Sequence, residues 1–263
     1  MSDTVQLMLV AACNRETHAT LAAALERFDV ACVLIVAPGW QATLPGSDGD
    51  EDGDGDEGAH DTRPALDQAV CQQLVTLSQS HDAAALIAND VATALGVGAD
   101  GCHLDTTPSL EDDYRAARTT LGSAAIVGVM PGLTRHLAMA LADAGADYVG
   151  YPLGDDPDDK PSSDKPSNNQ APNDQNANDQ DTNDQAPNDQ GARLLDWWVE
   201  IFESPAVAFT NGSIEMCERA IKAGPPEFLA VPVRGDHAIQ NLCQIERLIE
   251  LHGQLPVANK DAK

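Results

Sequence analysis

Two turns near the end of the chain have residue types suited to binding a phosphate group. Gly212 and Ser213 lie where a strand-like run, AVAFTNG, passes into a helix-like one, and Arg234 with Gly235 follows the next strand-like run, FLAVPV. Backbone N–H groups at the start of a helix bind anions, and a guanidinium adds positive charge. These four residues predict a phosphate-monoester site. The plainer alternative is that Ser213 only caps the helix and that Arg234 only belongs to a turn.

A second chemical pattern lies in an acidic segment, residues 42–63. The segment contains, at the spacing of calcium-loop ligands, Asp50, Asp52, Asp54, Gly55 and Asp61. The last ligand of such a loop is usually Glu, and no helix-like pattern leads into this one. We favour a disordered segment, because it has almost nothing apolar to bury.

The overall charge excludes several partners. The chain has 42 acidic and 15 basic residues, a net charge of −27. Binding nucleic acid or an anionic membrane surface needs clustered basic residues, so neither partner is expected. No apolar stretch has the length of a membrane span, and we expect a cytoplasmic protein. The six cysteines are widely spaced without a metal-binding pattern, which predicts reduced thiols in the core.

The rest of the chain alternates strand-like and helix-like patterns with short connections. Eight nearly continuous apolar runs are typical of strands buried on both faces, and they cover residues 5–11, 31–37, 84–89, 101–105, 125–130, 148–153, 206–212 and 228–233. Between them, apolar residues recur at helical spacing, as in Leu66, Val70, Leu74 and Leu77. Eight such units predict an α/β fold of the (β/α)8 TIM barrel type.

Three predicted helix-to-strand junctions have similar sequences, VGADGCHL, AGADYVGY and AGPPEFLA. In each, a glycine (Gly98, Gly145 or Gly224) is predicted to end the helix in the left-handed conformation. These junctions belong to the N-terminal face of a barrel, where sequence features serve stability.

Two polar segments interrupt the barrel pattern. Residues 42–63 follow the second strand-like run, and residues 154–192, rich in Asn, Asp, Gln and Pro, follow the sixth. Both compositions predict disordered insertions. In a barrel they replace connections on the C-terminal face, where barrel enzymes carry their chemistry. We predict one barrel domain over residues 1–255 and a flexible tail over residues 256–263.

One stretch resembles a known family. LIANDVATALGVGADGCHLD, residues 86–105, is similar to the thiamine-phosphate synthase and thiazole tautomerase family, whose barrels have a strand ending in I-N-D, a short helix and then G-A-D-G-V-H-L. The resemblance continues to the turn NGS, where the family has a phosphate-binding G-G-I turn. It implies a barrel of thiamine biosynthesis that condenses hydroxymethylpyrimidine diphosphate with thiazole phosphate, releases pyrophosphate and uses Mg²⁺.

The resemblance also implies roles for single residues. Asn89 and Asp90 match the Asn of the motif and its first magnesium-binding Asp. The family's second magnesium-binding Asp follows the motif's His at a position that is Pro108 here, and Asp105 is a substitute at a different position. Gly212 and Ser213 match the turn that holds the thiazole phosphate.

Several family groups that grip the diphosphate are replaced in this chain. A polar and basic Q-L-R-E-K segment aligns with Leu34, Val36 and Pro38, and a serine aligns with Met130. The sequence therefore leaves open whether the chain is an enzyme. The alternative is a non-catalytic barrel that binds a phosphorylated thiazole-like ligand or a protein partner, and a different barrel enzyme acting on a phosphorylated substrate is a third hypothesis. The sequence makes no prediction of oligomeric state.

Overall fold

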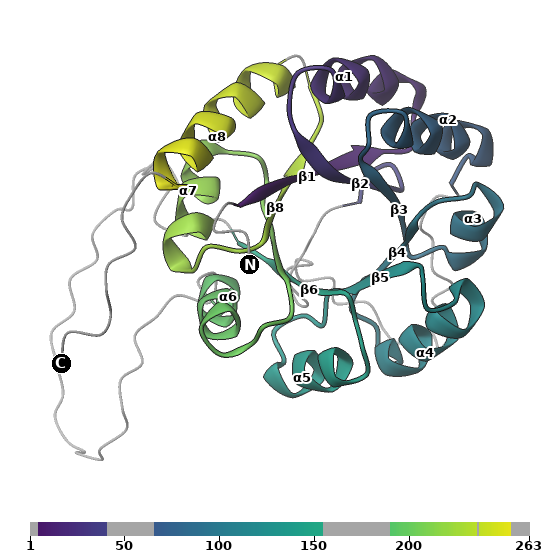
Figure 1. Ribbon diagram of the computed structural model, residues 1–263, viewed down its shortest axis with the longest axis vertical. Helices are drawn as coiled ribbons and strands as arrows, with labels where there is room; N and C mark the ends of the chain where they lie inside the picture. The colour runs from purple at the N-terminus through teal and green to yellow at the C-terminus, as the bar shows by residue number, and fades with distance from the viewer. Residues whose placement is uncertain (1–4, 41–65, 155–189, 236, 254–263) are drawn as a thin grey trace, which may run out of the picture.

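Eight parallel strands close into a barrel in the computed structural model, which describes residues 5–40, 66–154, 190–235 and 237–253. The strands follow chain order around the barrel, and the last pairs with the first. Figure 1 shows the helices as an outer ring around these strands. The predicted TIM barrel is confirmed.

The strands are β1 (Gln6–Ala12), β2 (Val30–Val36), β3 (Ala84–Ala88), β4 (Gly101–Leu104), β5 (Ile126–Val129), β6 (Tyr148–Pro152), β7 (Ala206–Phe209) and β8 (Phe228–Pro232). The helices are α1 (Arg15–Leu25), α2 (Gln68–Gln79), α3 (Val91–Gly96), α4 (Leu110–Leu121), α5 (Arg135–Asp143), α6 (Gln190–Ile201), α7 (Ile214–Ala223) and α8 (Ala238–Gly253). Every predicted strand is present, and its ends differ from the prediction by a few residues at most.

Both faces of each strand are buried, in two separate apolar clusters. Leu9 of β1 and Ile35 of β2 pack outward against the helices. Val10 and Leu34, their neighbours in sequence, point into the barrel interior. Because successive side chains of a strand point to opposite faces, this arrangement explains the continuous apolar runs in the sequence.

The predicted polar insertions fall mainly outside the described residues. This holds for residues 42–63, including the calcium-like spacing, for residues 256–263 and for most of residues 154–192. At the end of the last segment, residues 190–192 form the first turn of α6, and Ala192 is buried. A Cβ on Gly191 would come within 2.1 Å of the Pro152 carbonyl oxygen, so this glycine lets α6 approach the end of β6.

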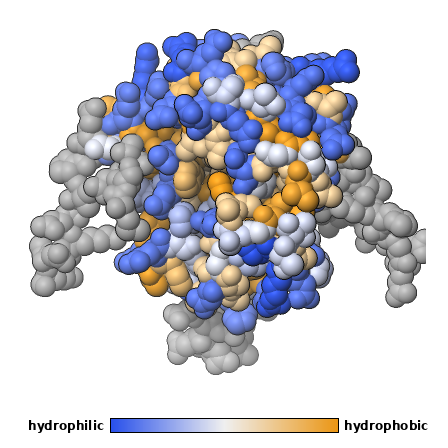
Figure 2. Space-filling view, turned by 45° about the vertical axis from the view of Figure 1, so that its right-hand side comes forward, coloured by the Kyte–Doolittle hydropathy of each residue, from blue (hydrophilic) through white to orange (hydrophobic). Residues whose placement is uncertain are grey.

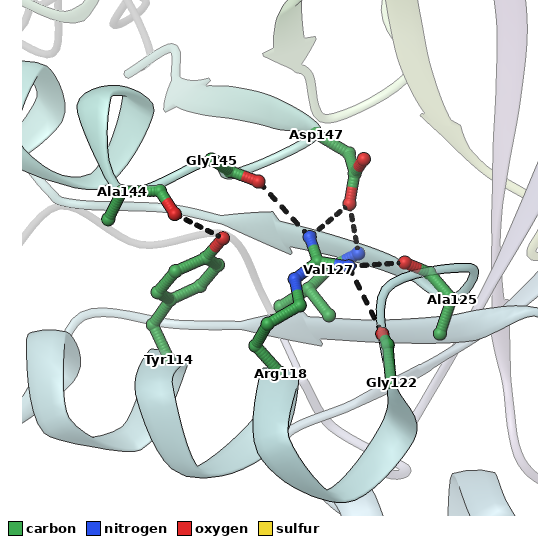
Figure 3. Close-up of polar contacts among 8 residues, drawn as sticks. All are labelled: Tyr114, Arg118, Gly122, Ala125, Val127, Ala144, Gly145 and Asp147. Atoms are coloured by element: carbon green, nitrogen blue, oxygen red, sulfur yellow. Dashed lines mark hydrogen bonds and ion pairs between the residues drawn. The ribbon is translucent and has the colours of Figure 1, made fainter.

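At the N-terminal face, Arg118 of α4 ties two strands together (Figure 3). Its guanidinium donates to the carbonyl oxygens of Ala125 at 2.6 Å and Gly145 at 3.1 Å, and to Asp147 Oδ2 at 2.6 Å. The same carboxylate oxygen accepts the N–H of Val127 in β5 at 2.7 Å. Asp147 directly precedes β6, so one carboxylate aligns the starts of β5 and β6 and holds them to α4.

Asp100, at the matching position before β4, repeats this arrangement. Its Oδ2 accepts the N–H of Ala85 in β3 at 2.8 Å and the Gln79 amide of α2 at 3.1 Å. The two similar G-A-D junctions of the sequence therefore perform the same task two strands apart.

The glycine prediction at these junctions is confirmed twice and wrong once. Gly98 has φ of +65° and Gly145 has φ of +96°, both in the left-handed region. Gly224 has φ of 178°, which is extended backbone. Pro225 follows Gly224, and a residue before proline is pushed to extended conformations. Gly224 instead serves a close approach, because a Cβ there would lie 3.0 Å from the Cα of Asp196.

Hydrophilic residues cover much of the surface seen in Figure 2, with apolar residues between them. The exposed large apolar side chains of the described residues, Leu95, Ile201 and Leu251, stand on three different helices. They therefore do not build one apolar helix face. No helix in the described ranges combines the length and the apolar character needed to cross a membrane.

Candidate functional site

Asn89 and Asp105 lie together at the carboxyl ends of β3 and β4. Asn89 Oδ1 accepts the backbone N–H of Asp105 at 2.8 Å, and Asn89 Nδ2 donates to Asp105 Oδ2 at 2.5 Å. Asn89 has φ of +57°, a conformation that Asn tolerates better than most residues. Two reciprocal hydrogen bonds hold this strained backbone and fix both side chains on the C-terminal face of the barrel.

Trp40, just after β2, covers the same carboxylate. Its indole Nε1–H donates to Asp105 Oδ2 at 2.6 Å. Its ring packs edge-on against Phe209 at the end of β7, with ring centroids 6.0 Å apart. Since β2, β4 and β7 stand around the barrel, the half-buried indole lies across the barrel mouth.

His103 lies deeper in the barrel and joins Asp105 to Tyr148 of β6. His103 Nε2 is 3.3 Å from Asp105 Oδ1, and His103 Nδ1 is 2.8 Å from the Tyr148 hydroxyl. Burial raises the pKa of Tyr148 well above its usual value, so the phenol keeps its proton. An ionised carboxylate only accepts hydrogen bonds, so the ring proton of His103 is assigned to Nε2, facing Asp105, and Nδ1 accepts the Tyr148 hydroxyl.

These contacts decide the charge of Asp105. Burial acts to raise the pKa of its carboxyl group, but the contacts with His103, Trp40 and Asn89 outweigh burial and hold this pKa below its usual value. Asp105 is therefore an anion at neutral pH. We call Trp40, Asn89, His103, Asp105 and Tyr148 the Asp105 cluster.

Two strand glycines make room for the aromatic part of the barrel interior. A Cβ on Gly128 would lie 1.9 Å from the Tyr148 ring, and one on Gly150 would lie 2.5 Å from Phe209. His103 stacks on Tyr148 with centroids 5.7 Å apart and contacts Phe209 at 5.1 Å. The rings of His103, Tyr148 and Phe209 therefore pack together inside the barrel.

A hollow of about 350 Å³ opens beside the cluster, between the ends of β3 and β4 and helix α4. Asn89 and Asp105 line one side, and Thr107 and Asp113 line another. Thr107 Oγ1 donates to Asp113 Oδ2 at 2.7 Å. The hollow gives a small ligand access to the outer side of the Asn89–Asp105 pair.

Asp90, expected as the first magnesium ligand, caps a helix. Its Oδ1 accepts the N–H of Thr93 at 2.8 Å, and its Oδ2 accepts the Thr93 hydroxyl at 2.7 Å. Asp105 Oδ2 accepts the N–H groups of Trp40 and Asn89, and Oδ1 lies 3.3 Å from His103 Nε2. In the described ranges no group of three or more His, Cys, Asp or Glu side chains is placed to hold a metal ion. In this structure the carboxylates of Asp90 and Asp105 are thus engaged in contacts within the chain.

The two turns predicted to bind phosphate lie next to each other. The N–H groups of the first turn, however, donate to side chains of the same turn. Gly212 has φ of +86°, and a Cβ there would lie 3.3 Å from the Pro232 ring, which places its turn against the end of β8. Its N–H donates to Thr210 Oγ1 at 3.3 Å, and the N–H of Ser213 donates to Asn211 Oδ1 at 2.8 Å. The side-chain oxygen of Asn211 thus occupies a position that an anion could take.

Ser213 also performs the plainer role considered for it. Its Oγ accepts the N–H of Met216 at 3.2 Å and caps α7. Arg234 and Gly235 are exposed after β8, and Gly235 has φ of +76°. The structure therefore brings Gly212 and Ser213 together beside the β8 turn, and it brings Asn89 and Asp105 together at the mouth.

Three of the residues that replace the family's diphosphate-binding groups belong to the core, whereas Pro38 is exposed. Leu34 and Val36 of β2 and Met130 after β5 are buried in the interior cluster. The sequence did not identify Trp40 or Tyr148 as site residues, and His103 served only as a reference position in the family motif. Glycines inside buried strands, as at Gly128 and Gly150, were the signal that large side chains come close there.

The fold and the polar carboxyl ends of its strands place the chain among the (β/α)8 barrel proteins. The family model described as thiamine monophosphate synthase matches residues 57–161. Thiamine-phosphate synthase of Rhodospirillum centenum is 30% identical over 221 residues, which cover 81% of this chain and 78% of that protein. The chain belongs to the thiamine-phosphate synthase family.

A second relative is also a thiamine-phosphate synthase, and solved structures share the fold. Thiamine-phosphate synthase of Erythrobacter litoralis is 32% identical over 164 residues, 62% of this chain, and the match spans just under two thirds of that protein, 64%. Among solved structures, thiamine phosphate pyrophosphorylase from Pyrococcus furiosus has a TM-score of 0.61 at 16% identity, covering 95% of this chain and 98% of that one. Tryptophan synthase from M. tuberculosis has a TM-score of 0.54 at 10% identity, with 95% and 91% covered. At these identities the structures support the barrel fold alone.

Proposed function

We propose that this chain acts in thiamine biosynthesis as a thiamine-phosphate synthase, joining hydroxymethylpyrimidine diphosphate to thiazole phosphate. In this reaction the bond between the pyrimidine methylene carbon and the diphosphate oxygen breaks, and pyrophosphate leaves with the electron pair. The thiazole ring nitrogen then forms the new bond to that carbon. Family membership supports this proposal.

The observation that carries the proposal is the anionic Asp105 held at the barrel mouth. The N–H groups of Trp40 and Asn89 donate to its Oδ2, and His103 Nε2 lies 3.3 Å from its Oδ1. A fixed carboxylate stabilises positive charge that develops on a nearby carbon, and an indole face adds to this effect. The pyrimidine methylene carbon gains such charge as pyrophosphate departs.

The turns after β7 and β8 are the proposed place for the phosphate of the thiazole substrate. A phosphate oxygen would replace Asn211 Oδ1 on the N–H of Ser213, and the Gly212 N–H and the Arg234 guanidinium lie on the same two turns. Gly235 lets the backbone turn there with positive φ.

Mg²⁺ enters this proposal through the family resemblance alone, and no step is assigned to it, because the described residues place no group of three or more His, Cys, Asp or Glu side chains to hold a metal ion. The proposed ligands are phosphorylated small molecules, and the proposed location is the cytoplasm.

The test is an assay of the full chain with both substrates and Mg²⁺, followed by chromatography of thiamine phosphate. Asp105→Asn keeps the shape of the side chain but removes its charge, and we expect kcat/KM to fall roughly 10- to 100-fold. Asp143→Asn, exposed at the end of α5, is the matched control. Absence of product from the unmodified chain, or equal rates for the Asp105 variant, would contradict the proposal.

A second candidate function is phosphate-ligand binding without catalysis. The observation in its favour is that Leu34 and Val36 are buried in the interior, where the resembled family has polar and basic groups. Without those groups a diphosphate loses charge-assisted hydrogen bonds, each of which contributes about 2 kcal/mol.

Thermal unfolding with each substrate alone separates the two candidates. Binding without catalysis predicts a higher Tm with thiazole phosphate and no product when both substrates are present; a ligand at about 100 times its Kd adds about 2.7 kcal/mol. Arg234→Met should reduce the Tm shift, whereas Arg115→Met, on the exposed side of α4, should not. Product formation by the unmodified chain excludes this candidate.

A further inference from the structure

Two buried cysteines from distant parts of the sequence are in direct contact. Cys13 directly follows β1, and Cys71 lies in the first turns of α2. Their sulfur atoms are 2.9 Å apart, although the residues are 58 positions apart in the chain. A covalent S–S bond is about 2.05 Å long, so a shift of about 1 Å would bring the sulfurs to bonding distance.

The surrounding structure holds both thiols in place. The N–H of Cys13 donates to the carbonyl oxygen of Val36 at 2.7 Å, which fixes the turn after β1 against the end of β2. Asp67 caps α2 by accepting the N–H groups of Ala69 and Val70. The Cys13 thiol also reaches the Asp67 carbonyl oxygen at 3.5 Å. The contact between the sulfurs therefore follows from the backbone on both sides.

The two thiols have different acidities. The hydrogen bond from Cys71 lowers the pKa of Cys13, against the effect of burial. The same hydrogen bond, together with burial, raises the pKa of Cys71. By contrast, burial raises the pKa of Cys102 and of Cys217 to about 11. Since a thiolate is the attacking species in disulfide exchange, Cys13 is the better nucleophile of the pair.

We propose that Cys13 and Cys71 form a dithiol site that reacts with small-molecule disulfides such as glutathione disulfide and becomes an intramolecular disulfide. The Cys13 thiolate attacks one sulfur of the small disulfide, forms a mixed disulfide and releases one thiol. The Cys71 thiol loses its proton and attacks the Cys13 sulfur, which releases the second thiol. The small disulfide is reduced to two thiols, and the protein loses two hydrogen atoms.

The new bond would connect the turn after β1 to α2 across the end of β2. Cys13 is 4% exposed and Cys71 is fully buried, so the reagent reaches Cys13 first. The bond closes a long loop of chain, which restricts the unfolded state and raises stability. We expect the oxidised protein to unfold at a Tm roughly 5–15 °C higher than the reduced protein.

The chain sequence makes the test specific. Cleavage before aspartate separates all six cysteines, placing Cys13 in residues 3–28 and Cys71 in residues 67–81. The full native chain is incubated with glutathione disulfide, free thiols are alkylated, and the peptides are analysed without reduction. The expected product is one linked pair, 3–28 with 67–81, lighter by two hydrogen atoms than the sum of its parts.

Two variants complete the experiment. Cys71→Ser should abolish the linked pair, while Cys243→Ser, at a half-buried cysteine on α8, should leave it unchanged. The peptide map of the unmodified chain decides the question even if Cys71→Ser does not fold. Unlinked peptides, separate glutathione adducts on Cys13 and Cys71, or a link to another cysteine would each overturn the proposal.

Discussion

The indole Nε1–H of Trp40 donates a 2.6 Å hydrogen bond to Oδ2 of Asp105, and this contact joins the residue just after β2 to the carboxyl end of β4. It spans the part of the barrel mouth above β3, the one strand between them. The same oxygen also accepts from Asn89. The polar part of the mouth is thus organised around one carboxylate.

Removing that carboxylate should destabilise the barrel. Asp105→Ala leaves the Trp40 indole and the Asn89 amide without their common acceptor, and an unsatisfied buried donor costs about 1–3 kcal/mol. We expect the free energy of unfolding in urea to fall by that amount. Asp143→Ala, at an exposed position, should change it by less than about 0.5 kcal/mol. Equal values for the two variants would show that the cluster contributes no stability.

The lowered pKa of Asp105 predicts a pH dependence of stability. An unfolded Asp has a pKa of about 3.9, and the folded value lies below it, so the folded state binds fewer protons near that pH. This contribution is fully present above about pH 5 and is lost as the pH falls through the folded pKa. The stability difference between the unmodified chain and Asp105→Asn should therefore shrink between pH 7 and pH 3 in urea unfolding. A constant or growing difference would refute this assignment.

The fold could be predicted from the sequence because its signals are local and repeated. Each strand is a continuous apolar run, and the G-A-D junctions mark the starts of β4 and β6. Gly224 was the exception: its extended conformation follows from Pro225, a local signal that the prediction did not use, whereas its close approach to Asp196 joins two distant elements. Such a contact between distant elements has no signature in a local pattern.

The site was harder to predict for the same reason. Asn89 and Asp105 were predicted as site residues from the resemblance to the family motif, but their mutual hydrogen bonds could not be read from spacing. Trp40 lies 65 positions from Asp105, and Tyr148 lies 45 positions from His103. Asp90 was predicted as a metal ligand because it matches the first magnesium-binding Asp of the family motif; in the structure its carboxylate caps α3.

The left-handed backbone of Asn89 allows strain and hydrogen bonding to be measured separately. Asn89→Gly removes both hydrogen bonds to Asp105 but accepts positive φ, whereas Asn89→Ala also pays a backbone cost of roughly 1–2 kcal/mol. We expect both variants to be less stable than the unmodified chain, with Ala below Gly by about that amount. Asp82, exposed and with φ of +59°, provides the control, because its Gly and Ala variants isolate the strain. Equal stability of the two Asn89 variants would argue against strain there.

Arg118 and Arg115 offer a matched comparison on one helix. Arg118 is 22% exposed and bonds to Ala125, Gly145 and Asp147, whereas Arg115 is 62% exposed and pairs with Glu111 and Asp112 of its own helix. Arg118→Met leaves strand-end carbonyls and Asp147 without their donor, so we expect a loss of about 1–3 kcal/mol in urea unfolding. Arg115→Met should lose less than about 1 kcal/mol, because exposed ion pairs contribute little. If Arg115→Met were the more damaging variant, the proposed role of Arg118 in joining α4 to β5 and β6 would be wrong.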